Sequence, residues 1–160
     1  MAGATQSIPV VFVAVSDPVG QGFVHSLAQP DGNITGFTLF EWASAGKLLE
    51  VLKEVAPVER VGVLYHPETT SAAPFKAFLR EVAPKSKVEL VEAPVRTMGD
   101  IQRALSHLDQ SNGGFLTLPD PFLNFHRAAI ASTAIRHKLP AVYPQRFFAT
   151  DGVCCLTVLT

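Results

Sequence analysis

Residues 44–65, SAGKLLEVLKEVAPVERVGVLY, carry the pattern that decides the fold. Ser44 can cap a helix that ends before Pro57, because proline cannot continue a helix. The apolar side of this helix, with its residues spaced three and four apart, consists of Leu48, Leu49, Leu52 and Val55. The run at residues 60–65 is almost continuously apolar, which is typical of a strand buried on both faces. The stretch therefore predicts a helix followed directly by a buried strand.

The same alternation continues on both sides of this stretch. Apolar runs predict further strands at residues 9–15, 87–91, 114–118, 139–143 and 154–159. Helical spacing predicts three further helices. One follows Thr70 or Ser71 and has the apolar residues Phe75, Phe78, Leu79 and Val82. Another follows a Thr97–Asp100 capping box and has Ile101, Ala104, Leu105 and Leu108, and the third is capped by Asn124 and has Ala128, Ala131 and Ile135. Strands that alternate with helices form a parallel sheet covered on both faces, so the sequence predicts the α/β class.

A loop rich in Gly and Pro is predicted at residues 29–36, QPDGNITG. It separates an initial strand-helix unit from the rest of the chain. One strand and one helix are too small to form a domain, so this unit should belong to a larger sheet. The exposed edge of its strand could also pair with a second copy and form a dimer.

Composition excludes several classes of function. The 160 residues include 13 basic and 14 acidic side chains, a net charge of −1, and neither sign forms a run. Nucleic-acid binding and membrane-surface binding are therefore not expected. The only cysteines, Cys154 and Cys155, are adjacent and predict neither a disulfide framework nor a zinc site. No nucleophile elbow, phosphate loop or dinucleotide fingerprint occurs, so neither an enzyme nor a cofactor is expected.

Candidate ligand contacts follow the predicted strands. In open parallel sheets, ligands bind beyond the carboxyl ends of the strands, where the strand order reverses. The residues at these positions are Ser16, Asp17, His66, Thr69, Thr70, Asp120, Phe122 and Arg146. A carboxylate, an aromatic wall and a guanidinium suit an amphoteric small solute such as an amino acid.

Most of these candidates also have a structural alternative. Asp17 and Asp120 stand beside prolines and can shape turns, whereas Thr69 and Thr70 can cap a helix. Phe122 can belong to the core, and Arg146 can lie between domains. The remaining histidines are expected on helix surfaces and are His25, His107, His126 and His137.

Residues 8–38, IPVVFVAVSDPVGQGFVHSLAQPDGNITGFT, resemble the middle of the ABC transporter substrate-binding protein family related to tryptophan- and phenylalanine-binding lipoproteins. The resemblance continues through KLLEVLKEVAPVERVGVLYHPET, GGFLTLPDPF and AIRHKLPAVYPQRFFATDGV. The turn at residues 30–36 and the Leu-Pro-Ala-Val-Tyr at residues 139–143 are its most specific parts. The resemblance implies a type I periplasmic-binding-protein fold, in which two α/β lobes close on a small solute and deliver it to an ABC permease.

Under this resemblance the chain divides into three parts. Residues 1–36 are a remnant of the first lobe, residues 37–152 are the second lobe with flavodoxin-like strand order, and residues 153–160 form an atypical, frameshifted tail. Ser16 and Asp17 would face the cleft from the first lobe, and the other candidates from the second. The family implies a periplasmic location, although residues 1–7 lack the features of a signal peptide and predict a cytoplasmic chain as written.

The resemblance also implies a truncated protein, because members of the family are roughly twice as long. We therefore expect a fragment of an importer's solute-binding component, with weak or no binding by the chain alone. Two alternatives stay open at this point. One is the ligand-sensing domain of a transcription regulator, which shares the two-lobed fold. The other is a small flavodoxin-like enzyme that uses Asp17 and Asp120 as acid and base.

Overall fold

The computed structural model describes residues 5–13, 15, 17–30, 32–38, 44–69, 72–111 and 113–150. Contacts within the chain divide it into two compact units, residues 1–42 and 43–160. The boundary expected after residue 36 falls inside a strand, Ile34–Phe37. The strand predicted at residues 154–159 and the tail predicted to result from a frameshift lie outside the described residues, as do the predicted caps Thr70 and Ser71.

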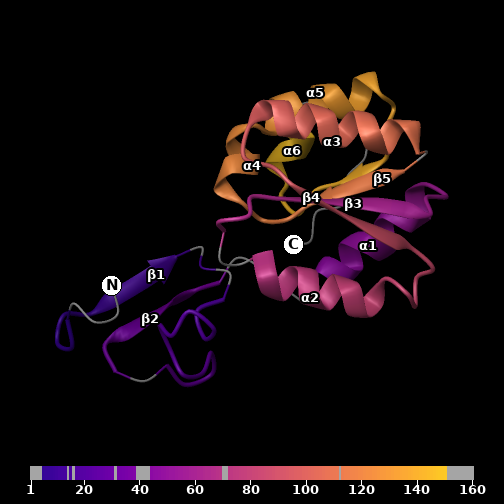
Figure 1. Cartoon of the computed structure of the whole chain (residues 1–160). Helices are drawn as coiled ribbons and strands as arrows, with labels where there is room; N and C mark the ends of the chain where they lie inside the picture. Colours follow the sequence, from indigo (N-terminus) through magenta and orange to yellow (C-terminus); the bar gives the residue numbers. More distant parts are fainter. Residues whose placement is uncertain are drawn as a thin grey trace. The chain divides into compact units, whose positions relative to one another are not determined.

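The larger unit contains a four-stranded parallel sheet in the order β4-β3-β5-β6 (Figure 1). Its strands are β3 (Arg60–Tyr65), β4 (Glu89–Pro94), β5 (Gly114–Thr117) and β6 (Ala141–Val142). The chain passes from β3 to β4 on one side and then returns to β5 on the other side of β3. The strand order therefore reverses between β3 and β5, which is the flavodoxin-like arrangement. The predicted α/β class is confirmed.

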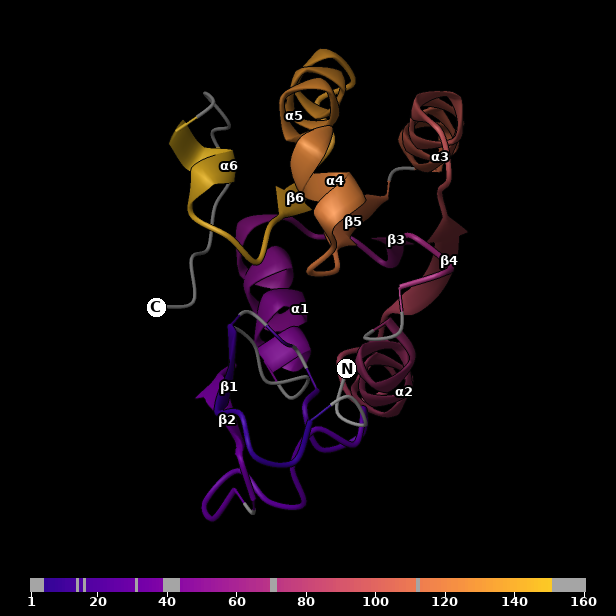
Figure 2. The ribbon, with the colours of Figure 1, turned by 90° about the vertical axis from the view of Figure 1, so that its left-hand side faces the viewer.

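Helices cover both faces of this sheet. One face carries α1 (Ser44–Val55) and α2 (Ala72–Val82), and the opposite face carries α3 (Met98–Gln110) and α5 (Arg127–Arg136). Figures 1 and 2 show the same layering from two directions, with the short helices α4 (Pro121–Phe125) and α6 (Phe147–Thr150) on the side of α5. None of the described helices is both long and apolar enough to cross a membrane.

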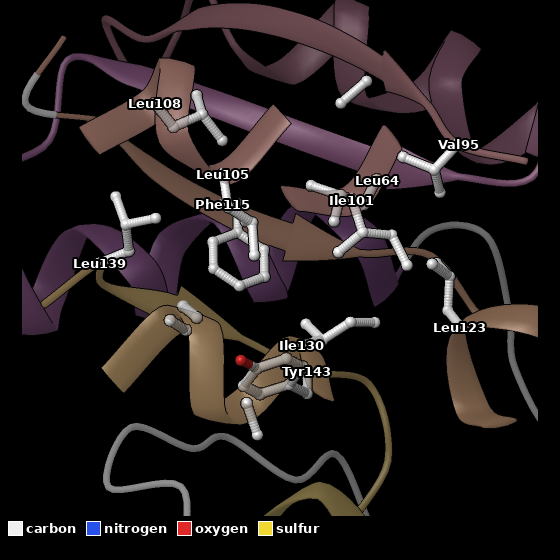
Figure 3. Packing of buried hydrophobic residues seen from close by; sticks show 14 of the residues in the cluster. Leu64, Val95, Ile101, Leu105, Leu108, Phe115, Leu123, Ile130, Leu139 and Tyr143 are labelled. Atoms are coloured by element: carbon white, nitrogen blue, oxygen red, sulfur yellow. The ribbon is translucent and has the colours of Figure 1, made fainter. Parts of the chain in front are cut away.

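The main core lies between β5 and the helices α3 and α5 (Figure 3). Phe115 of β5 is completely buried, and its ring meets Tyr143 edge-on at a centroid distance of 5.8 Å. Tyr143 in turn stacks on Phe148 at 4.4 Å. On β3, a Cβ atom added to Gly62 would lie only 2.4 Å from a methyl carbon of Leu108, so the absence of a side chain lets α3 lie close to the sheet.

Two predicted helices differ in detail from the observed ones. Ser44 is the first residue of α1 and does not precede it, and Val55 is 52% exposed because it is the last residue of the helix, where few neighbours cover it. Asn124 is not a cap, since Asp120 caps α4 and His126 precedes α5. The expected apolar residues Ala128 and Ile135 are exposed, and the buried side of α5 is Ile130, Ala131, Thr133 and Ala134. The buried face therefore differs from the predicted one, and it includes the polar residue Thr133.

The smaller unit contains a two-stranded parallel sheet in which β1 (Val10–Val13) pairs with β2 (Ile34–Phe37). The prediction of a loop throughout residues 29–36 was therefore wrong, because β-branched Ile34 and Thr35 form ladder pairs with β1. The expected strand-helix unit was also wrong. The described residues 17–30 form turns and bends without a helix, and Pro18 and Gly22 (φ 72°) fall where helical spacing would have to continue.

A charged cluster lies at the edge strand β4. Glu92 accepts hydrogen bonds from the Tyr65 hydroxyl at 2.8 Å, from Lys76 Nζ at 3.3 Å and from Arg80. Burial works against the charged form of Glu92, but the hydrogen bonds from Tyr65, Arg80 and Lys76 outweigh it and lower the pKa of this carboxyl. Burial likewise opposes the charge of Lys76, whose pKa is nevertheless raised by its hydrogen bonds to Tyr65 and Glu92.

This cluster predicts an acid-sensitive contribution to stability. A carboxyl whose pKa is lower in the folded state stabilises the fold above its unfolded pKa, near 4.5, and that contribution is lost as pH falls through the folded pKa. We therefore expect the unfolding free energy of the wild type to fall more steeply in acid than that of Glu92→Gln, measured by urea unfolding between about pH 7 and about pH 3. Glu81→Gln, which breaks an exposed ion pair between the end of α2 and Lys85 in the following turn, should keep the wild-type slope. Equal slopes for Glu92→Gln and the wild type would contradict this prediction.

Candidate functional site

The loops that follow β3 and β5 begin side by side, at the point where the strand order reverses. Leu64 and Thr117 are register partners in the two strands, and the Leu118 N–H donates to the Leu64 carbonyl at 2.9 Å. His66 directly follows β3, and Asp120 lies three residues after the end of β5. The carboxyl ends of parallel strands at such a reversal are where α/β domains bind small ligands.

Asp120 is a buried carboxylate that connects these two loops. Its side chain is almost completely enclosed, at 2% exposure, and it caps α4. Oδ1 accepts the backbone N–H groups of Phe122 at 2.7 Å and Leu123 at 3.2 Å. Oδ2 accepts the hydroxyl of Thr69, which lies on the loop after β3. Both carboxylate oxygens are therefore bonded to protein donors.

The loop after β3 is a tight turn held by its own backbone. The Thr69 N–H donates to the His66 carbonyl at 3.1 Å, and the Ala72 N–H donates to the Thr69 carbonyl at 3.1 Å. The Glu68 N–H points at Nδ1 of His66 at 3.4 Å. This turn fixes His66 at the end of β3.

Aromatic rings form a continuous row across the two loops. The Phe122 ring lies 5.3 Å from the His66 ring and 4.5 Å from the His126 ring, centroid to centroid. Phe125 meets His126 nearly perpendicularly at 5.1 Å and is 81% exposed. His66, Phe122 and His126 are half-buried. We call these residues, His66, Phe122, Phe125 and His126, the ring row.

The chemistry of this edge suits a flat, partly apolar molecule. The ring row offers aromatic faces and edges, which bind other rings in stacked or edge-on arrangements. The Asp120 carboxylate is occupied by protein donors, so the geometry supports the structural alternative for this residue, in which it shapes the turn. Among the described residues no three His, Cys, Asp or Glu side chains gather as metal ligands.

The structure brings together His66, Thr69, Asp120 and Phe122 from the predicted set. Asp17 lies in the smaller unit, where its Oδ1 accepts the Gly20 N–H at 2.8 Å and shapes a turn. Arg146 is exposed on the loop between β6 and α6. Ser16 and Thr70 lie outside the described residues.

Sequence reasoning missed His126 and Phe125. His126 was assigned to a helix surface, although it stands four residues after Phe122, a spacing that places side chains on the same side of a helix. The short helix α4 ends at Phe125, so His126 returns beneath the Phe122 ring. The sequence signal that could have revealed the position of His126 is the helix cap at Asp120, because this cap sets where α4 begins.

The larger unit is an α/β domain whose strand-end loops form an edge of the kind that binds small ligands. The family comparison is more specific. The chain belongs to the ABC transporter substrate binding protein family, whose model matches residues 1–158. The predicted family is confirmed.

Individual proteins and solved structures are similar to this chain. A tyrosine-binding protein of Clostridioides difficile (strain R20291) is 28% identical over 155 residues, which are 95% of this chain and 44% of that protein. A conserved domain protein of Vibrio cholerae has a similar structure, with a TM-score of 0.81 and 30% identity over 94% of this chain and 50% of that one. An ABC domain from Streptococcus pneumonia, solved in complex with L-Trp, shares the fold with a TM-score of 0.78 and 23% identity over 99% of this chain and 55% of that one. The chain spans about half the length of these relatives.

Proposed function

We propose that this chain is part of the solute-binding component of an ABC importer and that its ring row contacts an aromatic amino acid. The observation that carries the proposal is the position of the ring row at the reversal between β3 and β5. Family membership supports the solute-binding role, and a relative named as a tyrosine-binding protein supports an aromatic amino acid as the solute. The protein has no chemistry of its own in this proposal.

The enzymatic alternative receives no support from the geometry. It required Asp17 and Asp120 as an acid and a base. Asp17 accepts the backbone N–H of Gly20, and Asp120 accepts the N–H groups of Phe122 and Leu123. Asp120 is also buried and accepts the Thr69 hydroxyl. Groups engaged in this way are poorly placed to exchange protons with a substrate.

The working protein would have two lobes. In this proposal the lobe boundary follows the two compact units, so that residues 43–160 form one lobe and residues 1–42 belong to the other. A solute between the lobes would be delivered to a permease outside the cytoplasm. Hinge closure would bring contacts to the solute from both sides. A chain with about half of a relative's length would supply about half of those contacts.

The sheet of the smaller unit offers an apolar surface that fits this proposal. Val11, Val13 and Phe37 alternate on one face of β1 and β2 and are 59%, 70% and 72% exposed. A two-stranded sheet of this size is at best marginally stable alone. We infer that a protein as long as its relatives would extend this sheet with further strands and cover the apolar face with helices. A second copy pairing at the strand edge is the other occupant, and light scattering distinguishes the two.

Titration with aromatic amino acids tests the proposed solute. We expect L-tyrosine and L-tryptophan, but not L-alanine, to bind this chain weakly, with a dissociation constant of roughly 1 mM or above. Two-dimensional NMR of the ¹⁵N-labelled chain should show shifts at residues 66–69 and 122–126. Signals near His107, an exposed histidine on α3, serve as the internal control. Absence of shifts at the ring row would contradict the proposed solute. Tight stoichiometric binding would contradict the proposal that this chain supplies only about half of the contacts to the solute.

A further inference from the structure

The carboxylate of Asp120 performs two separable tasks. Oδ1 accepts the N–H groups of Phe122 and Leu123 and thereby starts α4. Oδ2 accepts the hydroxyl of Thr69, a residue 51 positions earlier in the chain. A helix cap requires only the first task. The bond to Thr69 therefore has a consequence beyond the start of the helix.

Both partners of Asp120 lie next to a ring of the ring row. On one side, the N–H of Phe122 is bonded to Oδ1, which fixes the backbone that carries the Phe122 ring. On the other side, Thr69 closes the turn that begins at the His66 carbonyl, through its own N–H at 3.1 Å. The two rings meet at a centroid distance of 5.3 Å. A single buried carboxylate thus links the supports of both rings.

We propose that Thr69 and Asp120 are positioning residues, which set the spacing of the His66 and Phe122 rings without touching the solute. The significance for solute binding rests on the proposed function. The spacing itself does not, because it is a property of the unliganded chain. The hydroxyl–carboxylate bond is shielded from water by the burial of Asp120, and a bond to a charged acceptor is stronger than a neutral one.

The matched pair Thr69→Val and Thr69→Ser tests the positioning role. Valine has nearly the shape of threonine but cannot donate, whereas serine keeps the hydroxyl. Neither change touches Oδ1, so α4 keeps its cap in both variants. The readout is the nuclear Overhauser effect between the ring protons of His66 and Phe122, together with the ring-current shift of the His66 protons. Circular dichroism confirms that each variant is folded.

We expect Thr69→Val to weaken the contact between the two rings. The signals of the His66 ring should then move toward the values of a histidine without an aromatic neighbour. Thr69→Ser should restore the wild-type signals. Ring signals that stay unchanged in a folded Thr69→Val chain would overturn the proposal, because the bond would then only stabilise the fold. An equal loss in Thr69→Ser would also overturn it, since the hydroxyl would not be the relevant group.

A binding measurement on the same two variants separates this proposal from the proposed function. With L-tyrosine as the probe, we expect Thr69→Val to bind about tenfold more weakly than Thr69→Ser. Equal affinities, with the ring spacing changed, would overturn the role in solute binding. A wild-type chain that binds neither L-tyrosine nor L-tryptophan would contradict the proposed solute, while the ring signals would still decide whether Thr69 and Asp120 set the spacing.

Discussion

Replacing Asp120 by alanine is expected to lower the unfolding free energy of the larger unit by about 2–4 kcal/mol. The change removes the cap of α4, so the N–H groups of Phe122 and Leu123 lose their acceptor. It also leaves the Thr69 hydroxyl without its partner in a part-buried place. Urea unfolding followed by circular dichroism measures the difference.

Asp120→Asn is the control for this prediction. Asparagine is as good a cap as aspartate, and its amide group lies within reach of the Thr69 oxygen. We expect this variant to keep most of the wild-type stability. If alanine and asparagine were equally destabilising, the negative charge and not the hydrogen-bond geometry would be the stabilising feature. A loss well under 1 kcal/mol in Asp120→Ala would contradict the assigned role altogether.

Replacing Phe115 by alanine should be still more destabilising, by about 3–5 kcal/mol. Phe115 is fully buried in the centre of β5 and contacts the core between the sheet and the helices α3 and α5. Its removal loses the burial of a large ring and leaves a cavity beside Tyr143, whose edge-on contact disappears. We expect a lower urea midpoint with an unchanged denaturant slope.

Phe125→Ala is the matched control, because this phenylalanine is 81% exposed. The same chemical change at that position should alter stability by about 0.5 kcal/mol or less. A comparable loss at both positions would mean that Phe125 is covered in solution. Unchanged stability in Phe115→Ala would contradict the core described above.

Much of the larger unit could be predicted from the sequence, because its elements are long and strongly patterned. The helix with Leu48, Leu49 and Leu52 and the strand at Arg60–Tyr65 were both found. The capping box at Thr97 and Asp100 is present as predicted. The smaller unit was misjudged because Ile34 and Thr35 stand among turn residues, and only pairing with a distant strand makes them a strand.

The location of the candidate site could be predicted from the sequence, but the contacts between its residues could not. Strand ends at the reversal of the sheet indicated His66, Asp120 and Phe122 from the pattern alone. The bond between Thr69 and Asp120 joins residues far apart in the chain, so no local pattern reveals it. His126 was missed for a related reason, since its contact with Phe122 depends on where the short helix α4 begins and ends.

The separation of Thr69 and Asp120 along the chain also bears on the order of folding. The segment between them contains α2, β4, α3 and β5, and the hydroxyl meets the carboxylate only when β5 has paired with β3. Contacts between distant residues form late, because the entropy of closing the intervening loop opposes them. A nascent chain would therefore hold its first strands together well before it could recognise any solute, and recognition would arrive as one of the last events of maturation.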